Sequence, residues 1–346
     1  MATSATPRAI IAQTLRHEQP AVCPYYVWVS EEMRAPLAEY YGAEQFIGHA
    51  NEITIFAGSY TALREVVART VWTSGDRFAD EYGIRYRQGN IKHVERPALI
   101  EPSLKNYTFP DLSTDEHFNG FEEWIETHAE RFRIAQLGQM FFERAWYMRG
   151  MEDFLMDLHV NPAFVEELLE GLEAVCMAVI ERLLADYGDR IDAIGLSEDY
   201  GTQRSLLISP GHWRRFVKPH LARICDRIHR GGKLVYIHSC GHVAPIVADM
   251  IEVGVDFLQP IQPEANDIFE LKRHFGKDLC LIGGISTQQT LPYGSPEDVC
   301  REVRACLDRM AAGGGYIMAP AKAIMQGVPI KNAIALIDAF VNQSGD

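Results

Sequence analysis

The amino-acid sequence predicts an α/β protein in which parallel strands close into a barrel of the TIM type. In the second half of the chain, short apolar runs alternate with long amphipathic segments, which is typical of right-handed βαβ units and a parallel sheet. The number of these repeats favours a closed barrel. An open nucleotide-binding sheet would carry a GxGxxG or GxxxxGKS/T turn after an early strand, and neither motif occurs.

The second half supplies five expected strands and five expected helices. The strands are the apolar runs at residues 191–196, 233–237, 256–259, 279–282 and 315–318. The helices cover residues 209–229, 243–251 and 268–275, a segment that opens at 295, and residues 330–341. Two of these helices begin with a serine cap followed by proline at the first helical position, as in Ser209-Pro210 and Ser295-Pro296.

The first half is less regular. We expect strands at residues 22–29 and 133–137, and helices at 140–149 and 162–184. Near residues 80–104, β-branched and aromatic residues alternate with glycine and proline. This stretch predicts an antiparallel excursion over the barrel mouth.

Composition limits the functional classes. No linker rich in proline, glycine or serine divides the chain, so we expect one barrel domain spanning residues 1–346. A net charge of -14 disfavours binding to nucleic acid or to an anionic membrane surface. The seven cysteines form no CxxC pair, and no secretory signal pattern or membrane-spanning run is present. We expect a cytoplasmic enzyme with reduced thiols. The oligomeric state is left open, with a homodimer as one expectation.

Polar side chains follow each of the five apolar runs. Reactive groups in a parallel barrel project from the carboxyl ends of the strands. The segments at these ends are 197–203, 238–242, 259–264, 283–288 and 319–322. Five such ends predict an active-site face. Its candidate substrate-binding residues are Tyr200, Gln203, Gln262 and Gln288.

His238 and Cys240 are two residues apart, so on an extended strand both side chains point the same way. An imidazole and a thiolate on one face are suitable ligands for zinc, although a catalytic zinc site normally has three protein ligands. A buried thiol beside a hydrogen-bonding histidine is the alternative. Glu198 and Asp199 are candidate acid–base residues, of which at most one faces the pocket. Lys322 is placed at the barrel mouth by its position after the last strand.

Several motifs, taken in order, resemble the uroporphyrinogen decarboxylase-like superfamily. They are Glu198-Asp199-Tyr200-Gly201-Thr202-Gln203, Ser209-Pro210, His238-Ser239-Cys240-Gly241, Gly283-Gly284-Ile285-Ser286-Thr287-Gln288 and Gly313-Gly314-Gly315-Tyr316. The similarity covers most of the chain and is densest between residues 192 and 340. The resemblance implies a (β/α)8 barrel.

The resemblance also implies a choice between two chemistries. True uroporphyrinogen decarboxylases carry an arginine-rich segment after the first strand, and residues 26–34 lack that pattern. This difference favours the cobamide-dependent methyltransferase branch. In its thiol methyltransferases, zinc is held by a His-x-Cys pair and a later cysteine. His238 and Cys240 match the pair, but residues 319–323 contain no cysteine. A third ligand would then be Glu198 or Glu264, and a site without metal, with Lys322 supplying positive charge, is also open.

Our leading hypothesis is transfer of a methyl group between a small methylated substrate, such as an O-methyl compound or aryl methyl ether, and a cobamide on a partner protein. Zinc on His238 and Cys240 would act as a Lewis acid, and Glu198 or Asp199 as general acid or base. The aromatic residues 82–86 would offer an apolar surface to a ring. The alternatives are decarboxylation of a tetrapyrrole-like or smaller acid, with Lys322 holding the carboxylate, and a corrinoid receptor without turnover.

Overall fold

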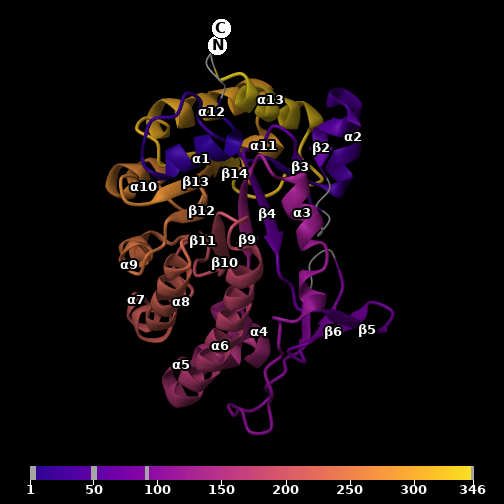
Figure 1. The fold of residues 1–346 in the computed structure, drawn as a ribbon, viewed down its shortest axis with the longest axis vertical. Helices are drawn as coiled ribbons and strands as arrows, with labels where there is room; N and C mark the ends of the chain where they lie inside the picture. The colour runs from indigo at the N-terminus through magenta and orange to yellow at the C-terminus, as the bar shows by residue number, and fades with distance from the viewer. Residues whose placement is uncertain (1–4, 48–52, 90–92, 344–346) are drawn as a thin grey trace.

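The computed structural model describes residues 5–47, 53–89 and 93–343. Its central element is a curled parallel sheet whose strand order is β14-β13-β12-β11-β10-β9-β4 (Figure 1). In chain order these strands are β4 (Thr61–Glu65), β9 (Phe132–Gln136), β10 (Ala193–Ser197), β11 (Leu234–His238), β12 (Phe257–Ile261), β13 (Cys280–Ile285) and β14 (Tyr316–Pro320). Neighbours in sequence are neighbours in the sheet, as successive βαβ units require.

Residues 24–27 occupy the eighth position and close the sheet into a barrel. On one side, the Tyr26 N–H donates to the Met318 carbonyl of β14 at 2.8 Å, and the Met318 N–H donates to the Pro24 carbonyl at 2.9 Å. On the other side, the Tyr60 N–H donates to the Tyr25 carbonyl at 2.9 Å, directly before β4. The predicted TIM-type barrel is therefore confirmed.

Helices surround this barrel. They are α1 (Pro7–Leu15), α2 (Glu31–Tyr41), α3 (Phe121–Thr127), α4 (Phe142–Arg149), α5 (Met151–Val160), α6 (Pro162–Tyr187), α7 (Pro210–His212), α8 (Lys218–Arg230), α9 (Val247–Glu252), α10 (Ile268–Phe275), α11 (Thr290–Tyr293), α12 (Pro296–Met310) and α13 (Ile330–Val341). The helix α12 shows why they form. Its cap Ser295 and Asp298 make a reciprocal capping box, and Val299, Val303, Cys306 and Met310 bury one face against the barrel wall.

The helix expected at residues 209–229 is interrupted. Ser209 caps the short α7, residues 213–217 form a π-helical turn, and α8 continues to Arg230. The expected helix at 243–251 likewise begins with a 3-10 turn before α9. The expected α10 and α13 agree with the structure at both ends.

The first half contains elements that the sequence did not reveal. The barrel strand β4 and the helix α1 were not predicted. The strand expected at 22–29 contributes the barrel edge at residues 24–27 and then β1 (Trp28–Ser30), which pairs with β3 (Ile53–Phe56) in a small antiparallel sheet that includes β2 (Phe46–Ile47). Tertiary pairing defines these short segments, because they are too short for a clear periodic pattern.

The antiparallel excursion is present as the four-stranded sheet β5-β6-β7-β8. Its strands are β5 (Thr70–Ser74), β6 (Arg77–Asp80), β7 (Arg85–Arg87) and β8 (His93–Arg96), so it begins earlier and ends earlier than the expected 80–104. Residues 90–92 lie outside the described part of the chain. The sheet follows the carboxyl end of β4, and Figure 1 shows β5 and β6 beyond that end of the strand.

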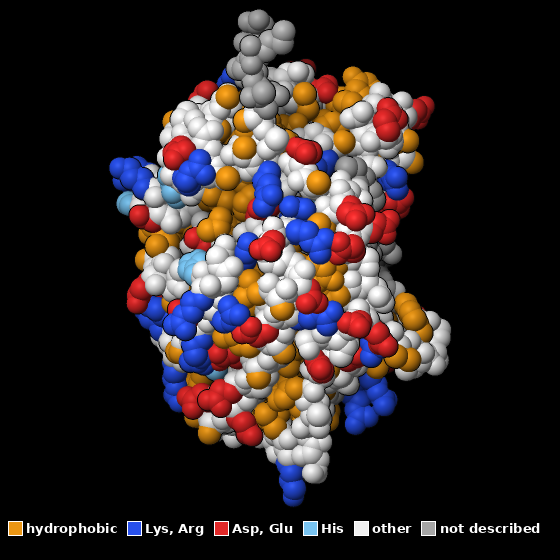
Figure 2. All heavy atoms as spheres, in the orientation of Figure 1, with side chains coloured by type: hydrophobic (Ala, Val, Ile, Leu, Met, Phe, Trp, Pro, Cys, Tyr) orange, Lys and Arg blue, Asp and Glu red, His pale blue; other side chains and the backbone are white. Residues whose placement is uncertain are grey.

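The surface carries charges of both signs. Acidic and basic side chains are interspersed over the face seen in Figure 2, with no large region of one sign. Ion pairs between helices contribute to this pattern, for example Arg215 with Glu166 at 2.9 Å. Among the described residues, no helix is long and apolar enough to cross a membrane.

Candidate active site

A cavity of about 380 Å³ opens where the carboxyl ends of the barrel strands meet. It is lined by Asp199, Gln203, Cys240, Gln262, Thr287, Gln288, Ala321, Lys322, Ala323, Met325 and Val328. These residues come from the segments after β10, β11, β12, β13 and β14. A larger cavity of about 640 Å³ lies between the β12–α10 segment and α12, and it shares no lining residue with the first. The smaller cavity is the candidate active site because the reactive side chains line it.

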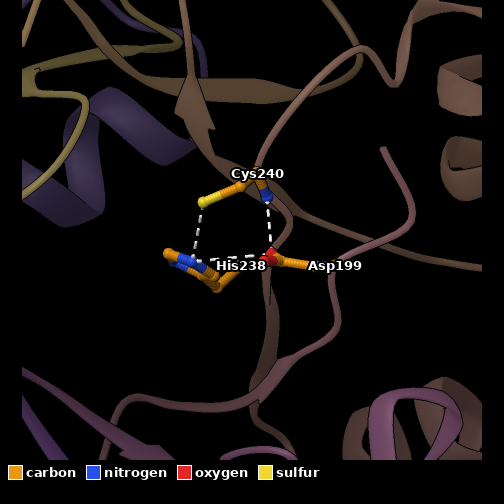
Figure 3. A group of neighbouring side chains, drawn as sticks. All are labelled: Asp199, His238 and Cys240. Carbon is orange, nitrogen blue, oxygen red and sulfur yellow. Dashed lines mark hydrogen bonds and ion pairs between the residues drawn. The ribbon is translucent and has the colours of Figure 1, made fainter. Parts of the chain in front are cut away.

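Asp199, His238 and Cys240 form a compact group, which we call the trio (Figure 3), and Asp199 and Cys240 line this cavity. The Cys240 Sγ lies 3.4 Å from the His238 Nε2. The Asp199 Oδ1 lies 3.9 Å from the same nitrogen. One ligand atom from each residue lies within 4.8 Å of the other two.

The pairing of β10 with β11 explains why Asp199, and not Glu198, belongs to the trio. Ser197 is opposite His238 in the parallel register. Asp199 is two residues beyond Ser197, and Cys240 is two residues beyond His238, so both side chains keep the same orientation. The Asp199 Oδ1 accepts the backbone N–H of Cys240 at 2.8 Å, which ties the two strand ends together.

His238 is held by Gln259, a residue to which the sequence assigned no role. The Gln259 Oε1 lies 2.5 Å from the His238 Nδ1 and also accepts the Tyr236 hydroxyl at 2.7 Å. An amide oxygen can only accept, so it fixes Nδ1 as the protonated nitrogen and leaves the Nε2 lone pair facing Cys240 and Asp199. Burial lowers the pKa of the His238 imidazole, which also favours the neutral ring, although the Asp199 charge opposes this shift.

The donor set of the trio fits zinc. Nitrogen, sulfur and carboxylate oxygen are its usual ligands, and three protein ligands with one open position describe catalytic zinc sites. Tetrahedral zinc places sulfur and nitrogen ligands about 3.5 Å apart and nitrogen and oxygen ligands about 3.3 Å apart. The observed 3.4 Å matches the first separation, and the 3.9 Å requires a small inward movement of Asp199. Without a metal, burial raises the pKa of the Cys240 thiol to about 12.

Glu198 and Glu264, the expected third ligands, lie elsewhere. Glu198 is fully buried and turns toward α4, where its carboxylate accepts the N–H groups of Phe141 at 3.0 Å and Glu143 at 2.8 Å. It thus satisfies backbone donors at the start of a helix. Glu264 accepts the Ser286 hydroxyl at 2.5 Å and the Gln288 N–H at 3.1 Å. The third residue beside His238 and Cys240 is therefore Asp199, and not Glu198 or Glu264 as expected.

Glu143 of α4 is a further acidic residue beside the trio. Its carboxylate accepts the backbone N–H of Asp199 at 3.3 Å and the side-chain amide of Gln139 at 2.6 Å. Burial, reinforced by the nearby Asp199 charge, raises the pKa of Glu143 to about 8. A carboxyl group of this kind holds a proton near neutral pH. Glu143 lies in the first turn of α4, seven residues after β9 ends at Gln136, so its place after a barrel strand was a signal that could have identified it.

The expected substrate-binding residues divide into two groups. Gln203, Gln262 and Gln288 all line the cavity and contact one another. Tyr200 does not reach it, because its ring is buried against Phe142 and Trp213. The proposed substrate contact of Tyr200 is therefore not made in this structure.

Lys322 lines the cavity and is solvent-exposed, as its place after the last strand predicts. Its positive charge acts on both His238 and Cys240, which places it near the trio. By contrast, Tyr82 and Tyr86 are buried. The Arg144 guanidinium lies 4.4 Å from the centre of the Tyr82 ring, and it also pairs with Asp80 at 2.7 Å. These two rings pack the β5–β8 sheet against α4 through Arg144, so they offer no open surface to a substrate.

Comparison with known proteins agrees with the barrel fold and with the family that the motifs resemble. The sequence model of the uroporphyrinogen decarboxylase (URO-D) family matches residues 102–342. A methylated-thiol–coenzyme M methyltransferase from Methanosarcina mazei is 23% identical over 253 residues, which cover 71% of this chain and 65% of that protein. A uroporphyrinogen decarboxylase from Geotalea daltonii is 23% identical over 219 residues, which cover 61% of this chain and 60% of that protein. The chain thus spans less than two thirds of the length of each relative.

A solved structure shows the same fold. It is described as a methyltransferase from Methanosarcina mazei, and it superposes with a TM-score of 0.69 at 16% sequence identity. The alignment covers 98% of this chain and 99% of that chain. At this identity the likeness establishes the fold and leaves the chemistry to the site itself.

Proposed function

Because the chain belongs to the uroporphyrinogen decarboxylase (URO-D) family, we propose on that premise that it is a methyltransferase of the family's cobamide-dependent branch. Its substrate is a small methylated compound, in our proposal an O-methyl compound such as an aryl methyl ether. The acceptor is a cobamide carried by a partner protein. The observation that supports this proposal most directly is the trio Asp199, His238 and Cys240, two members of which line the cavity.

The chemistry of ether cleavage accounts for the trio. When the bond between a methyl carbon and oxygen breaks, the electron pair stays on oxygen, which must be stabilised or protonated as it departs. Asp199, His238 and Cys240 would hold a zinc ion, and zinc in such a site supplies a Lewis acid for that oxygen. Gln259 keeps the His238 ring oriented for this role, as a hydrogen-bonded partner does for most metal-bound histidines.

The remaining polar residues have supporting roles in this proposal. Lys322 supplies positive charge at the trio, where negative charge develops on the leaving oxygen. Gln203, Gln262 and Gln288 bind the polar part of the substrate. Met325 and Val328 line the cavity with apolar side chains that suit the methylated part.

The size of the cavity supports a separate cobamide carrier. A volume of about 380 Å³ suits a small substrate but is too small for a corrinoid ring system. The cobamide must then approach the mouth from outside, bound to another protein.

The seven cysteines are all free, which supports a reducing, cytoplasmic location.

Decarboxylation is the competing activity, since one relative bears that name. Lys322 could hold a single substrate carboxylate. It is, however, the one basic side chain among the described residues that line the cavity, and a porphyrin with several carboxylates needs more. The proposal therefore ranks methyl transfer above decarboxylation.

The test combines metal analysis with a methyl-transfer assay. We expect the purified protein to contain about one zinc per chain and to methylate free cob(I)alamin from a panel of O-methyl compounds, followed by absorbance. The His238→Ala, Cys240→Ala double variant should lose the zinc and at least about 100-fold in rate. A Cys300→Ala variant is the control, because Cys300 is exposed and distant from the cavity lining. Undiminished turnover in the double variant would contradict the proposal, and release of carbon dioxide without cobalamin would favour the decarboxylase.

A further inference from the structure

Three glutamine amides that line the cavity, Gln203, Gln262 and Gln288, form a hydrogen-bonded group that we call the amide cluster. The Gln203 Oε1 accepts the Gln262 Nε2 at 3.2 Å and the Gln288 Nε2 at 3.2 Å. The three side chains come from the segments after β10, β12 and β13. The cluster therefore exists only when three separate strand ends are brought together.

A backbone group fixes which way each amide faces. The Gly241 N–H can only donate, and it lies 3.2 Å from the Gln262 side-chain oxygen. Gln262 must therefore present its NH2 group to Gln203, which in turn must present its oxygen. With that oxygen facing both neighbours, Gln288 must also present its NH2 group. One backbone donor thus orients all three amides.

This orientation leaves two complementary groups without partners. Gln203 and Gln288 are both solvent-exposed, and neither the Gln203 Nε2 nor the Gln288 Oε1 has a hydrogen-bond partner in the protein among the described residues. The first is a donor and the second is an acceptor. Neither group carries a charge. The positive charge of Lys322 acts on His238 and Cys240 of the trio. A neutral group that both donates and accepts, such as a hydroxyl or a primary amide, matches this pair.

Glu264 holds the turn that carries Gln288. Its Oε1 accepts both the Gln288 N–H at 3.1 Å and the Ser286 hydroxyl at 2.5 Å. From the other side, the Glu302 Oε1 of α12 accepts the Ser286 N–H at 3.1 Å. The turn from Ser286 to Gln288 is thus fixed by two carboxylates, and only Glu264 bonds to Gln288 itself.

We propose that the amide cluster is a specificity subsite for a hydroxyl or primary amide group of the substrate, and that Glu264 is its positioning residue. The inference rests on the proposed function for the identity of the reaction, since it assigns the polar part of that methylated substrate. It gives Glu264, which the sequence offered as a metal ligand, a role in recognition. Glu264 acts through Gln288 and need not touch the substrate.

The experiment measures binding to the zinc-loaded protein by calorimetry, without cobalamin. The probes are 2-methoxyphenol and methoxybenzene, which differ by one hydroxyl group. We expect the wild-type protein to prefer 2-methoxyphenol about tenfold, the effect of one well-placed neutral hydrogen bond. Glu264→Ala should reduce this preference to less than about threefold, whereas Glu264→Gln, which keeps an acceptor oxygen, should retain most of it.

Further measurements separate recognition from a general loss of structure. Zinc content should be unchanged in both Glu264 variants, because neither alters the trio. If Glu264→Ala fails to fold, Gln288→Leu removes the amide directly and should abolish the preference in the same way. Equal binding of the two probes to the wild-type protein overturns the assignment, as does binding of neither probe. A preference that survives in Glu264→Ala overturns the role of Glu264.

The result of the binding experiment does not depend on whether the protein transfers methyl groups. Hydroxyl preference without methylation of cobalamin would reject the proposed function and support the subsite. Methylation without hydroxyl preference would do the reverse.

Discussion

The trio and the amide cluster lie in the same cavity but are assembled in different ways. The trio comes from two neighbouring strands, and two of its members are separated by a single residue. The amide cluster comes from three loops and is oriented by the Gly241 N–H and by Glu264. The trio thus depends on strand register, whereas the amide cluster depends on hydrogen bonds between loops. If the trio binds zinc and the amide cluster selects the substrate, as we propose, we expect that each property can be altered without the other.

The largest expected effect comes from the adjacent acids Asp199 and Glu198. Asp199→Ala should lower zinc affinity by at least about 100-fold and abolish methyl transfer, because one of three ligands is lost. Glu198→Ala should retain zinc but lower the free energy of unfolding by about 2–4 kcal/mol, since two buried N–H groups lose their acceptor. Chelator competition and chemical denaturation measure the two quantities. Loss of zinc in Glu198→Ala with normal stability would show that the assignment of these two acids is reversed.

An intermediate effect is expected at Gln259, which orients His238 from behind. Gln259→Leu removes the acceptor for the His238 Nδ1–H while keeping a similar volume. Zinc affinity should fall by about 10- to 100-fold, as is usual when the partner of a metal-bound histidine is removed. Gln203→Leu is the matched control in the amide cluster and should leave zinc affinity unchanged. An equal loss of zinc affinity in both variants would mean that the trio and the amide cluster are not independent.

The smallest expected effect is a pH-dependent change in stability at Glu302, which holds the turn that carries Gln288. Burial raises the pKa of Glu302 in the folded protein above its ordinary value. The folded state therefore binds this proton more tightly than the unfolded state does, and the associated stability is lost as pH rises from the unfolded pKa through the folded pKa. Glu302→Gln keeps an acceptor for the Ser286 N–H but does not titrate. Its free energy of unfolding should change less than that of the wild type across this pH range, and a parallel change in both proteins would contradict the prediction.

Much of the barrel could be predicted because its signals are local. Apolar runs, serine caps and the helices α10 and α13 are determined by short stretches of sequence. The strand β4 was not predicted, because its five residues show no clear periodic pattern. Residues 22–29 were predicted as a strand, but the closure that they make depends on pairing with distant strands. The bounds of the antiparallel excursion also depend on pairing between its strands. It was expected near residues 80–104, and its strands lie between residues 70 and 96.

The sequence by itself determined the barrel class, the polar strand ends and the alignment of His238 with Cys240, because side chains two residues apart on a strand share a face. Only the tertiary structure decided that Asp199 completes the trio, that Gln259 orients His238 and that Glu264 supports Gln288. The physical reason is that the register between strands and the hydrogen bonds between loops are set by residues 21 to 85 positions apart in the sequence. A carboxylate can serve as a ligand, a helix cap or a loop anchor, and its chemistry is the same in all three. Its neighbours in the folded barrel determine which of these roles it has.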